Sequence, residues 1–593
     1  MTERITLELT VTVRSPFLFR GLAGGLVGLD AAQLRDEDDK PVLPGTQLQG
    51  VLKESLEDLA AAAPDIIARQ EVSRLFGRGS PEFKDAGEYD RPERGCILVG
   101  DLMATLAKTD EETTRIEIDD ASGSARSGHL QVVELVAPFG TEVGFDGNIV
   151  VFWPDGQSGR IVAALNKALK LIPAIGAFKS AGFGEINNQR SGAKVKEIRR
   201  LAIGATLAGA QERYGFKLKF DRPFLVNTRR VAENAFIGAE IVPGAALKGA
   251  LARKLELAGG KQALAEYEAA LTALVISHAF PANLEGKPGG EPLPHSMIAA
   301  SDGSRFGDAL CPGGPGLGRG AMIEGRPAWF QSDWKEGWFE AAATVLGRAE
   351  YASPAPLPRT HTAIDERGVA AETQLYTGIA RSPRDPADTS GARGFLFTID
   401  LCNVPETEKE RAQRLVAFLA EGLDGIGRTG ATASFERWQA GDAAATAKPV
   451  AGHSNLFAVV LRTPAVLTDP LTTLTAAEAY ADYWRREVRG ARLVDFCARQ
   501  DLAGGSLAMR RRPWRGTYHP FVVTAAGSAF LLEGDIAQQL DHLIRPGLPL
   551  PVFGGGADPL DWRNCPFVPQ NGFGEIRADY LSAQTQLTPI EHV

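Results

Sequence analysis

The sequence predicts an α+β protein made of tandem ferredoxin-like units, each with the order β-α-β-β-α-β. Three observations lead to this prediction. An alternating strand that ends at a proline, a Pro-Gly turn that opens a helix, and a glycine-rich loop recur in the same order along the chain. Three such units, the third less complete than the others, would fill the 593 residues.

The recurring strand begins each unit. Apolar residues alternate with polar ones, which is the period of a half-buried strand, and a proline then ends the pattern. The three segments are 4–14, 216–226 and 456–467, and their prolines are Pro16, Pro223 and Pro464.

The Pro-Gly turn follows in the first two units. The motif Pro-Gly-x-x-Leu-x-Gly begins at Pro44 and again at Pro243. Pro-Gly favours a turn, and a helix behind it can expose its first free backbone N–H groups. We therefore expect helices over 46–63 and 245–258.

Further matches lie downstream. Ile118-Asp119 and Ile364-Asp365 precede new β patterns, and each unit then has a helix and a glycine loop. These elements are expected at 141–153, 160–172 and 176–184 in the first unit and at 394–401, 407–422 and 425–432 in the second. The end of the chain repeats the glycine loop, because Gly-Phe-Gly-Glu-Ile occurs at 182–186 and at 572–576.

The repeats set the predicted domains. They are a first domain over 1–205 with an insertion near 105–132, a second over 207–450, and a third unit over 453–593. The stretch 283–350 is rich in Gly and Pro and is expected to be an insertion or surface arm. The stretch 440–452 is expected to be a linker.

Composition limits the class of protein. Hydrophobic residues make up 44% and charged residues 23% of the chain, and no run of eighteen apolar residues could cross a membrane. The N-terminus lacks a signal-peptide core, and the 5 cysteines lack zinc-site spacing, so a reduced, cytoplasmic protein is expected. The net charge of -9 argues against a generally basic coat for nucleic acid but leaves room for a local basic groove.

One loop differs between the first two units. Pro16 and Pro44 are 28 positions apart, whereas Pro223 and Pro243 are 20 apart. The longer loop contains Asp30, a candidate general base or metal-ligating carboxylate. The alternative is that Asp30 is one of several acids on a solvated loop. The shorter loop has Glu233 and Glu240 but no Asp, so the second unit has no equivalent of Asp30.

Candidate RNA-binding residues fall into four groups, whose shared property is a backbone N–H or a cation that could meet a phosphate. A tight turn, a solvated basic face or a packed Trp would explain each group equally simply, and the loops are not Walker motifs. The groups are the helix start (Gly45, Thr46, Gln49, Lys53), the first glycine loop (Gly176, Lys179, Ser180, Gly182), the second unit (Arg229, Arg230, Lys248, Arg428) and a basic-aromatic cluster (Arg510, Arg511, Arg512, Trp514).

Two histidines lie beside the Ile-Asp segments. His129 and His361 are conceivable general bases, but the sequence shows no partner for either, and a solvated or satisfied side chain is the simpler expectation.

These motifs together resemble the RAMP superfamily of CRISPR effector proteins. Residues 1–205 resemble a type III backbone (seven-type) subunit, through Pro44-Gly45-Thr46-x-Leu48-x-Gly50, Ile118-Asp119, Val133-Glu134, Gly140-Thr141-Glu142-Val143 and the loop 176–184. Residues 207–593 resemble the cap (five-type) subunit of type III-D systems, through Pro243-Gly244-x-x-Leu247-Lys248-Gly249, the stretch 359–365 and Gly527-Ser528-Ala529-Phe530.

The resemblance implies a function. A fused backbone and cap subunit would bind guide RNA (crRNA) with its 5′ tag, pair with target RNA, and assemble with other backbone, small and large subunits. Asp30 would cut the target with the help of a divalent cation such as Mg²⁺, and the insertion near 105–132 would be the thumb that kinks the duplex. Three alternatives remain open: a non-catalytic scaffold or cap, a guide-processing endoribonuclease, and a structural repeat protein without nucleic acid.

Overall fold

The computed structural model confirms the α+β class. In the part of the chain that it describes, no helix is both long enough and apolar enough to cross a membrane. It describes residues 2–21, 28–78, 93–104, 106, 111–119, 121–204, 206–207, 209, 211–226, 229–232, 234–282, 292–301, 306–312, 320–323, 326–332, 354–364, 370–385, 388–392, 394–438, 446–504, 520–552 and 565–581.

The first unit is an antiparallel sheet with helices on one face. Its sheet has the order β10-β1-β9-β6-β2, with β5 also paired to β9, so first and third strands of the unit lie at the centre. The elements are β1 (Thr2–Arg14), β2 (Val42–Leu43), α1 (Gly45–Ala62), α2 (Arg69–Phe76), β3 (Gly77–Arg78), β4 (Glu93–Arg94), β5 (Ile97–Val99), β6 (Leu102–Met103), β9 (Glu142–Pro154), α3 (Ser158–Leu171) and β10 (Gly192–Leu201).

The second unit has the same strand order. Its first strand, β11, lies between β24 and β26, and β14 and β15 both pair with β24. The elements are β11 (Arg213–Phe220), α4 (Gly244–Ala273), β14 (Val275–Ile276), β15 (Phe280–Pro281), β24 (Phe395–Asp400), η2 (Glu406–Glu408), α6 (Lys409–Ala420), β25 (Leu423–Ile426) and β26 (Ala431–Trp438). The helix expected at 245–258 ends at a kink, Gly259-Gly260, beyond which α4 continues.

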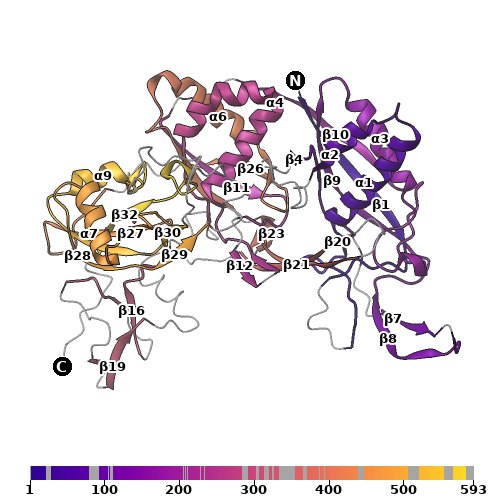
Figure 1. Ribbon diagram of the computed structural model, residues 1–593, viewed down its shortest axis with the longest axis horizontal. Helices are drawn as coiled ribbons and strands as arrows, with labels where there is room; N and C mark the ends of the chain where they lie inside the picture. The colour runs from indigo at the N-terminus through magenta and orange to yellow at the C-terminus, as the bar shows by residue number, and fades with distance from the viewer. Residues whose placement is uncertain are drawn as a thin grey trace.

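The third unit is complete, whereas the sequence suggested a partial one. Its sheet has the order β28-β31-β27-β32. The elements are β27 (Leu456–Leu461), α7 (Ala476–Glu487), β28 (Arg492–Cys497), β31 (Ala529–Glu533), α9 (Ala537–Ile544), η3 (Pro569–Asn571) and β32 (Ile576–Tyr580). Its first helix begins with a capping box between Thr475 and Glu478 instead of Pro-Gly, which explains why the motif did not recur. The three units lie in a row (Figure 1).

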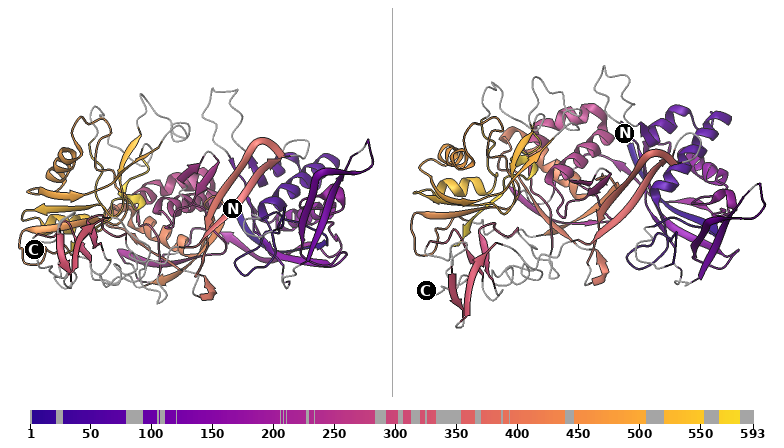
Figure 2. Two further views of the ribbon diagram at one scale, coloured as in Figure 1. Left: turned by 90° about the horizontal axis from the view of Figure 1, so that it is seen from below. Right: turned by 60° about the horizontal axis from the view of Figure 1, so that its bottom comes forward.

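Each unit carries a hairpin between the second and third strands of its sheet. These are β7 (Glu111–Ile118) with β8 (Ala125–Leu135), β20 (Pro356–Ile364) with β21 (Ala370–Arg381), and β29 (Gln500–Ala503) with β30 (Phe521–Thr524). Figure 2 shows β20 and β21 reaching from the second unit toward the first, where Arg359 meets Asp101. The expected insertion near 105–132 thus includes most of the first hairpin.

The described part of the 283–350 stretch forms a small sheet below the third unit (Figure 1). It contains β16 (Met297–Ala300), β17 (Phe306–Asp308), β18 (Gly320–Ile323) and β19 (Arg326–Gln331). Asp308 anchors it, because its carboxyl accepts hydrogen bonds from Tyr580 of β32 and, at 2.7 Å, from Ser296. Burial raises the pKa of Asp308. The expected linker also packs here, since Val450 is buried against this unit.

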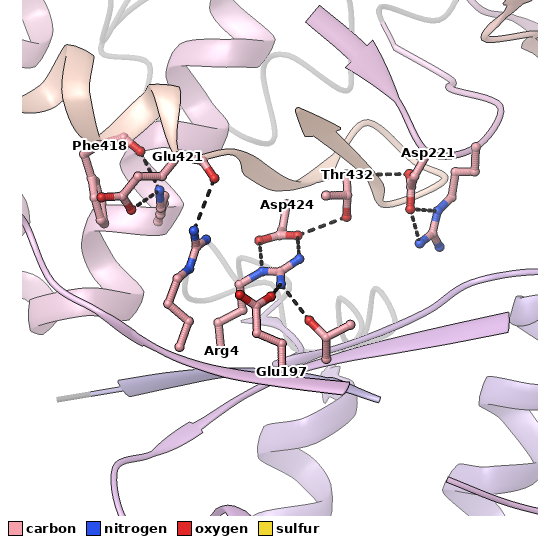
Figure 3. A network of polar contacts seen from close by, with 11 residues as sticks. Arg4, Glu197, Asp221, Phe418, Glu421, Asp424 and Thr432 are labelled. Atoms are coloured by element: carbon pink, nitrogen blue, oxygen red, sulfur yellow. Dashed lines mark hydrogen bonds and ion pairs between the residues drawn. The ribbon is translucent and has the colours of Figure 1, made fainter. Parts of the chain in front are cut away.

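The first and second units share an extensive contact. Val150, Phe152 and Leu201 lie on the face of the first sheet away from its helices and are buried in the core of the second unit. At the centre, the Nε and Nη2 atoms of Arg4 donate to the two carboxylate oxygens of Asp424 in β25, each at 2.8 Å (Figure 3). Both side chains are largely buried, so the pair is shielded from solvent.

Replacing Asp424 by Asn should loosen this contact by about 3–5 kcal/mol, because the buried Arg4 then keeps only the exposed Glu197, at 4.0 Å, as counter-charge. Hydrogen exchange of the β1 and β25 amides measures it. The exposed Arg414–Glu410 pair is the control, and removing it should leave the exchange of these amides nearly unchanged. If Asp424→Asn and removal of the Arg414–Glu410 pair had equal effects, the Arg4–Asp424 pair would not stabilise the contact between the units.

The same pair makes the contact pH-dependent. Burial alone would raise the pKa of Asp424, but the hydrogen bonds and charge of Arg4 outweigh it and hold that pKa below its usual value. The stabilisation is therefore complete above about pH 4, the pKa of an unfolded Asp, and is lost as pH falls through the folded pKa. The Asp424→Asn variant should lack this acid-induced loosening, which hydrogen exchange between pH 5 and 3 would reveal.

Candidate nucleic-acid interface

The Asp30 loop joins the base of hairpin β7–β8. The Asp30 N–H donates to the Val132 carbonyl at 2.8 Å, and its carboxylate Oδ2 accepts the Val132 N–H at 2.7 Å. Ala31 then pairs in parallel with Val133. Asp30 is exposed, and its Oδ1 has no hydrogen bond to any described residue. The loop therefore presents one carboxylate oxygen to solvent at the foot of the hairpin.

A buried ion pair holds the Asp30 loop against strand β8 at the base of hairpin β7–β8, which we call the foot of the hairpin. Arg35 binds the Oε1 atom of Glu134, and the Gln33 N–H donates to Oε2 of the same carboxylate at 2.7 Å. The Arg35 and Glu134 side chains are only 12% and 8% exposed. The basic-acidic sequence around Arg35 thus serves to attach the loop to β8, and its partner Glu134 was missed from the sequence as a site residue.

The first glycine loop meets the same foot. Gly176 has φ +109°, and a Cβ there would lie 2.8 Å from the Leu18 carbonyl oxygen, so only glycine fits. Leu18, Ala31, Val133 and Phe183 form one buried apolar cluster, which joins the glycine loop to the Asp30 loop and the hairpin. Lys179 and Ser180, in the turn η1 (Lys179–Ala181), and Gly182 remain exposed beside it.

Two arginines gather on this loop. Phe178 adopts a left-handed conformation, and the guanidinium carbons of Arg115 and Arg20 lie 3.7 Å and 4.9 Å from the centre of its ring. Arg20 follows the first strand, whereas Arg115 comes from β7 of the hairpin. Nothing in the sequence links these residues, because the fold alone brings them together.

The start of α1 is less open than expected. The Gly45 N–H donates to Asp101 Oδ1 at 2.8 Å, and a Cβ on Gly45 would lie 2.5 Å from the Val99 carbonyl. Gly45 is therefore a buried packing glycine whose N–H is already bound, and its assignment to RNA was wrong on this point. Thr46 and Lys53 are exposed and Gln49 is half-buried; Lys53 pairs with Glu57 at 3.7 Å.

The second unit has an alanine at the place of Asp30. The Leu34 N–H binds the Phe19 carbonyl in the first unit, and the Ala239 N–H binds the Val226 carbonyl in the second. These two hydrogen bonds occupy equivalent places in the two units, so Leu34 aligns with Ala239. The residues four positions before them, Asp30 and Ala235, are therefore aligned as well. The strand β13 (Ala235–Ile237) also pairs in parallel with the second strand of its hairpin, β21. The fold repeats, but the carboxylate does not.

The basic residues of the second unit differ in exposure. Arg229 and Arg230, on β12 (Arg229–Ala232), and Arg428 are exposed, and Arg428 lies over the Phe236 ring at 4.8 Å. Lys248 does not fit its predicted role as an RNA-binding residue. Its Nζ donates to the Leu274 and Thr272 carbonyls at 2.6 and 3.4 Å, and burial lowers its pKa to about 7.

The glycine loop of the third unit is not open to phosphate. A Cβ on Gly572 would lie 2.4 Å from the ring of the buried His278, and Gly244 packs against the Asn571 carbonyl. This loop therefore joins the third unit to the start of α4. The predicted cluster Arg510, Arg511, Arg512 and Trp514 lies outside the described residues, between β29 and β30.

Both histidines have neighbours that the sequence did not reveal. His129 Nδ1 lies 2.7 Å from Glu117 on the first hairpin, and Glu117 also binds Arg126 at 2.6 Å. The Arg126 hydrogen bond holds the pKa of Glu117 below its usual value. His361 stacks on Tyr376, and burial lowers its pKa, as does the charge of Arg359.

The acids after Asp30 are not simply solvated. Arg384, on β22 (Arg384–Asp385), which pairs with β23 (Asp388–Ala392), reaches Asp38 at 2.6 Å and Glu37 at 3.6 Å. Its hydrogen bond holds the pKa of Asp38 below the usual value. The second unit therefore contacts the Asp30 loop directly.

No group of three or more His, Cys, Asp or Glu side chains that could hold a metal ion occurs among the described residues. Asp30 by itself offers one carboxylate oxygen, Oδ1, that has no hydrogen bond to a described residue. Mg²⁺ commonly binds through one or two carboxylates and completes its shell with water and substrate phosphates. The residues present thus fit a cation that substrate RNA helps to hold.

Comparison with known proteins shows which family and which solved structures the chain resembles. A family model described as the RAMP superfamily matches residues 10–187, and no curated protein sequence matches the chain. Among solved structures, a chain of the type III-B Cmr-beta bound to cognate target RNA aligns at 16% identity, over 33% of this chain and 60% of that one, with a TM-score of 0.22. A chain of the apo Cmr-beta aligns at 10% identity, over 32% and 98%, with a TM-score of 0.24. This chain thus spans less than two thirds of the first matched chain. The matched residues 10–187 include Asp30, hairpin β7–β8 and the first glycine loop.

Proposed function

We propose that the chain is a subunit of a type III CRISPR effector ribonucleoprotein. It binds guide RNA including the 5′ tag, and its first unit cuts guide-paired target RNA. One observation carries the proposal: the RAMP region brings Asp30, the hairpin and the glycine loop to one place, although they lie far apart in the sequence.

The hairpin suits a duplex that must be opened. Ile116, Ile118 and Leu130 are 55%, 50% and 60% exposed. A two-stranded hairpin with exposed apolar side chains gains stability when these are covered, and nucleobases offer flat apolar faces. We propose that this apolar side inserts between bases and displaces one target nucleotide toward Asp30.

Asp30 would act on the displaced nucleotide. Its free Oδ1 would accept the proton of the ribose 2′-hydroxyl, while Oδ2 stays on the Val132 N–H and fixes the carboxylate. A divalent cation held by RNA phosphates and water beside Asp30 would supply charge stabilisation at the scissile phosphate. Lys179 and Ser180 would contact the RNA backbone nearby.

The other units would hold the guide and cap the assembly. Arg229, Arg230 and Arg428 are exposed cations on the second unit and fit phosphate contacts. We place the 5′ tag along the second and third units, with other backbone, small and large subunits adjoining.

The test is the RNA bound to the purified full-length protein. We expect a raised 260/280 nm absorbance ratio and RNA that begins with a repeat-derived 5′ tag. The loaded protein should cut labelled RNA complementary to the guide when Mg²⁺ is present. Protein free of nucleic acid, or random cellular RNA, would contradict the proposal.

A second candidate function is guide processing, which the His129–Glu117 pair favours. A carboxylate on Nδ1 orients the ring and leaves Nε2 as a base. Incubating the unloaded protein and its His129→Ala variant with precursor RNA tests it. Cleavage within the repeat that only the parent protein performs would support processing.

A further inference from the structure

Arg115 and Arg20 use only part of their binding capacity. When a guanidinium group lies over an aromatic ring, its planar face contacts the ring. Its N–H groups point outward in the plane and stay available for hydrogen bonds. Both groups contact the Phe178 ring: Arg115 from the hairpin and Arg20 from the segment that follows the first strand. Two cations from separate elements thus converge on one ring.

Neither arginine has a carboxylate partner among the described residues. Other arginines of the first unit do, which shows that acids are at hand to neutralise them. Arg14, Arg35, Arg126 and Arg190 pair with Glu185, Glu134, Glu117 and Glu142. The stack on Phe178 is therefore a local concentration of uncompensated positive charge, and the exposed Lys179 next to it adds to it.

We propose that Arg20, Phe178 and Arg115 form a binding site for one RNA phosphodiester, which the two guanidinium groups hold through their in-plane N–H groups. This inference rests on the proposed function and adds a residue-level site that sets where Asp30 cuts.

The site lies beside the cutting position but apart from it. Arg115 pairs with Gln131 on β8, and Asp30 bonds to Val132 on the other side of that strand. The strands of Arg115 and Asp30 are thus two strand spacings apart, about 10 Å. In this proposal the site holds a phosphodiester next to the bond that is cut and thereby fixes the register of the strand.

The experiment measures salt dependence and cut position with the full-length protein. One arm titrates guide RNA onto unloaded protein, and the other titrates complementary RNA onto guide-loaded protein, each across 50–300 mM salt. Arg20→Ala and Arg115→Ala should each reduce the slope of log affinity against log salt by about 0.7–0.9 in one arm, which identifies the strand held. Affinity in that arm should fall about 10-fold at fixed salt.

Further variants separate binding from folding. Arg115→Lys keeps the charge but loses the planar fork, so the slope should persist while affinity falls and cuts spread to neighbouring bonds. Phe178→Leu keeps apolar bulk and should weaken binding as the alanine variants do. The control is Arg126→Ala on the same hairpin, where Glu117 already neutralises the charge. It should leave slope and cut position unchanged.

The outcomes separate this site from the proposed function. If the parent protein binds and cuts RNA while Arg20→Ala and Arg115→Ala behave like the Arg126→Ala control in both arms, the site is refuted and the function stands. If the parent protein binds no RNA, both fail together.

Discussion

Replacing Asp30 by Asn is expected to lower the single-turnover rate of target cleavage by about 10²–10⁴-fold, the usual contribution of a general base. The asparagine side-chain oxygen can still accept the Val132 N–H, so the loop keeps its attachment to β8. Only the charge and the proton-accepting oxygen are lost. Affinity for guide and target RNA should therefore stay within about twofold of the parent value.

A second acid in the same loop provides the control. The Asp36 carboxylate accepts the N–H groups of Asp38 and Lys40 at 2.9 and 2.8 Å, just as Asp30 accepts that of Val132. Asp36→Asn is thus an equivalent change and should leave cleavage within about threefold of the parent rate. Full cleavage by Asp30→Asn at every site would reduce Asp30 to a structural residue and support a scaffold.

Replacing Glu134 by Ala should strongly destabilise the attachment of the Asp30 loop to β8. It leaves Arg35 buried with only the half-exposed Asp39, at 3.6 Å, as counter-charge, and it leaves the Gln33 N–H without its acceptor. Breaking a buried pair from one side costs about 3–5 kcal/mol. Hydrogen exchange of the amides at 30–35 and 132–134 reports the opening of this foot and does not require two-state unfolding of the whole chain. Cleavage should fall with it, because Asp30 loses its support.

Two further changes test whether the buried Arg35–Glu134 pair causes the effect of Glu134→Ala. Replacing both partners, Arg35→Met with Glu134→Leu, should recover part of the lost protection, because apolar side chains of similar size can substitute for the buried pair although the Gln33 N–H still lacks its acceptor. Removing the exposed Arg14–Glu185 pair should cost under about 1 kcal/mol. If Glu134→Ala costs no more than that, the pair does not anchor the loop.

Local chemistry made much of the fold predictable. Pro-Gly turns, alternating strands and positive-φ glycines act within a few residues, so the repeats were visible in the sequence. The third unit was underestimated because a Thr475–Glu478 capping box starts its helix by different chemistry. Lys248 was misassigned because its position in the motif says nothing about the returning half of α4, whose last carbonyls bind it.

The site was predictable only in part. Asp30 stood out as a candidate through its position in the longer loop before Pro44-Gly45, combined with the resemblance to the RAMP superfamily. The surrounding contacts did not stand out, because Glu134, Arg115 and Asp101 contact residues between 56 and 99 positions away in the sequence. Long-range pairing of this kind follows from strand order and packing, and a single sequence carries no local signal for it.

The contacts of Arg384 and Arg359 have a further consequence. Arg384 holds the turn after Asp30 at Asp38, and Arg359 reaches the start of α1 through Asp101, so the second unit grips both ends of the segment 36–45. Under the proposed function, the part that receives the 5′ tag and the part that cuts are braced within one polypeptide. The protein would then act as a ruler: the distance from the end of the guide to its cut is fixed by the fold before any other subunit joins.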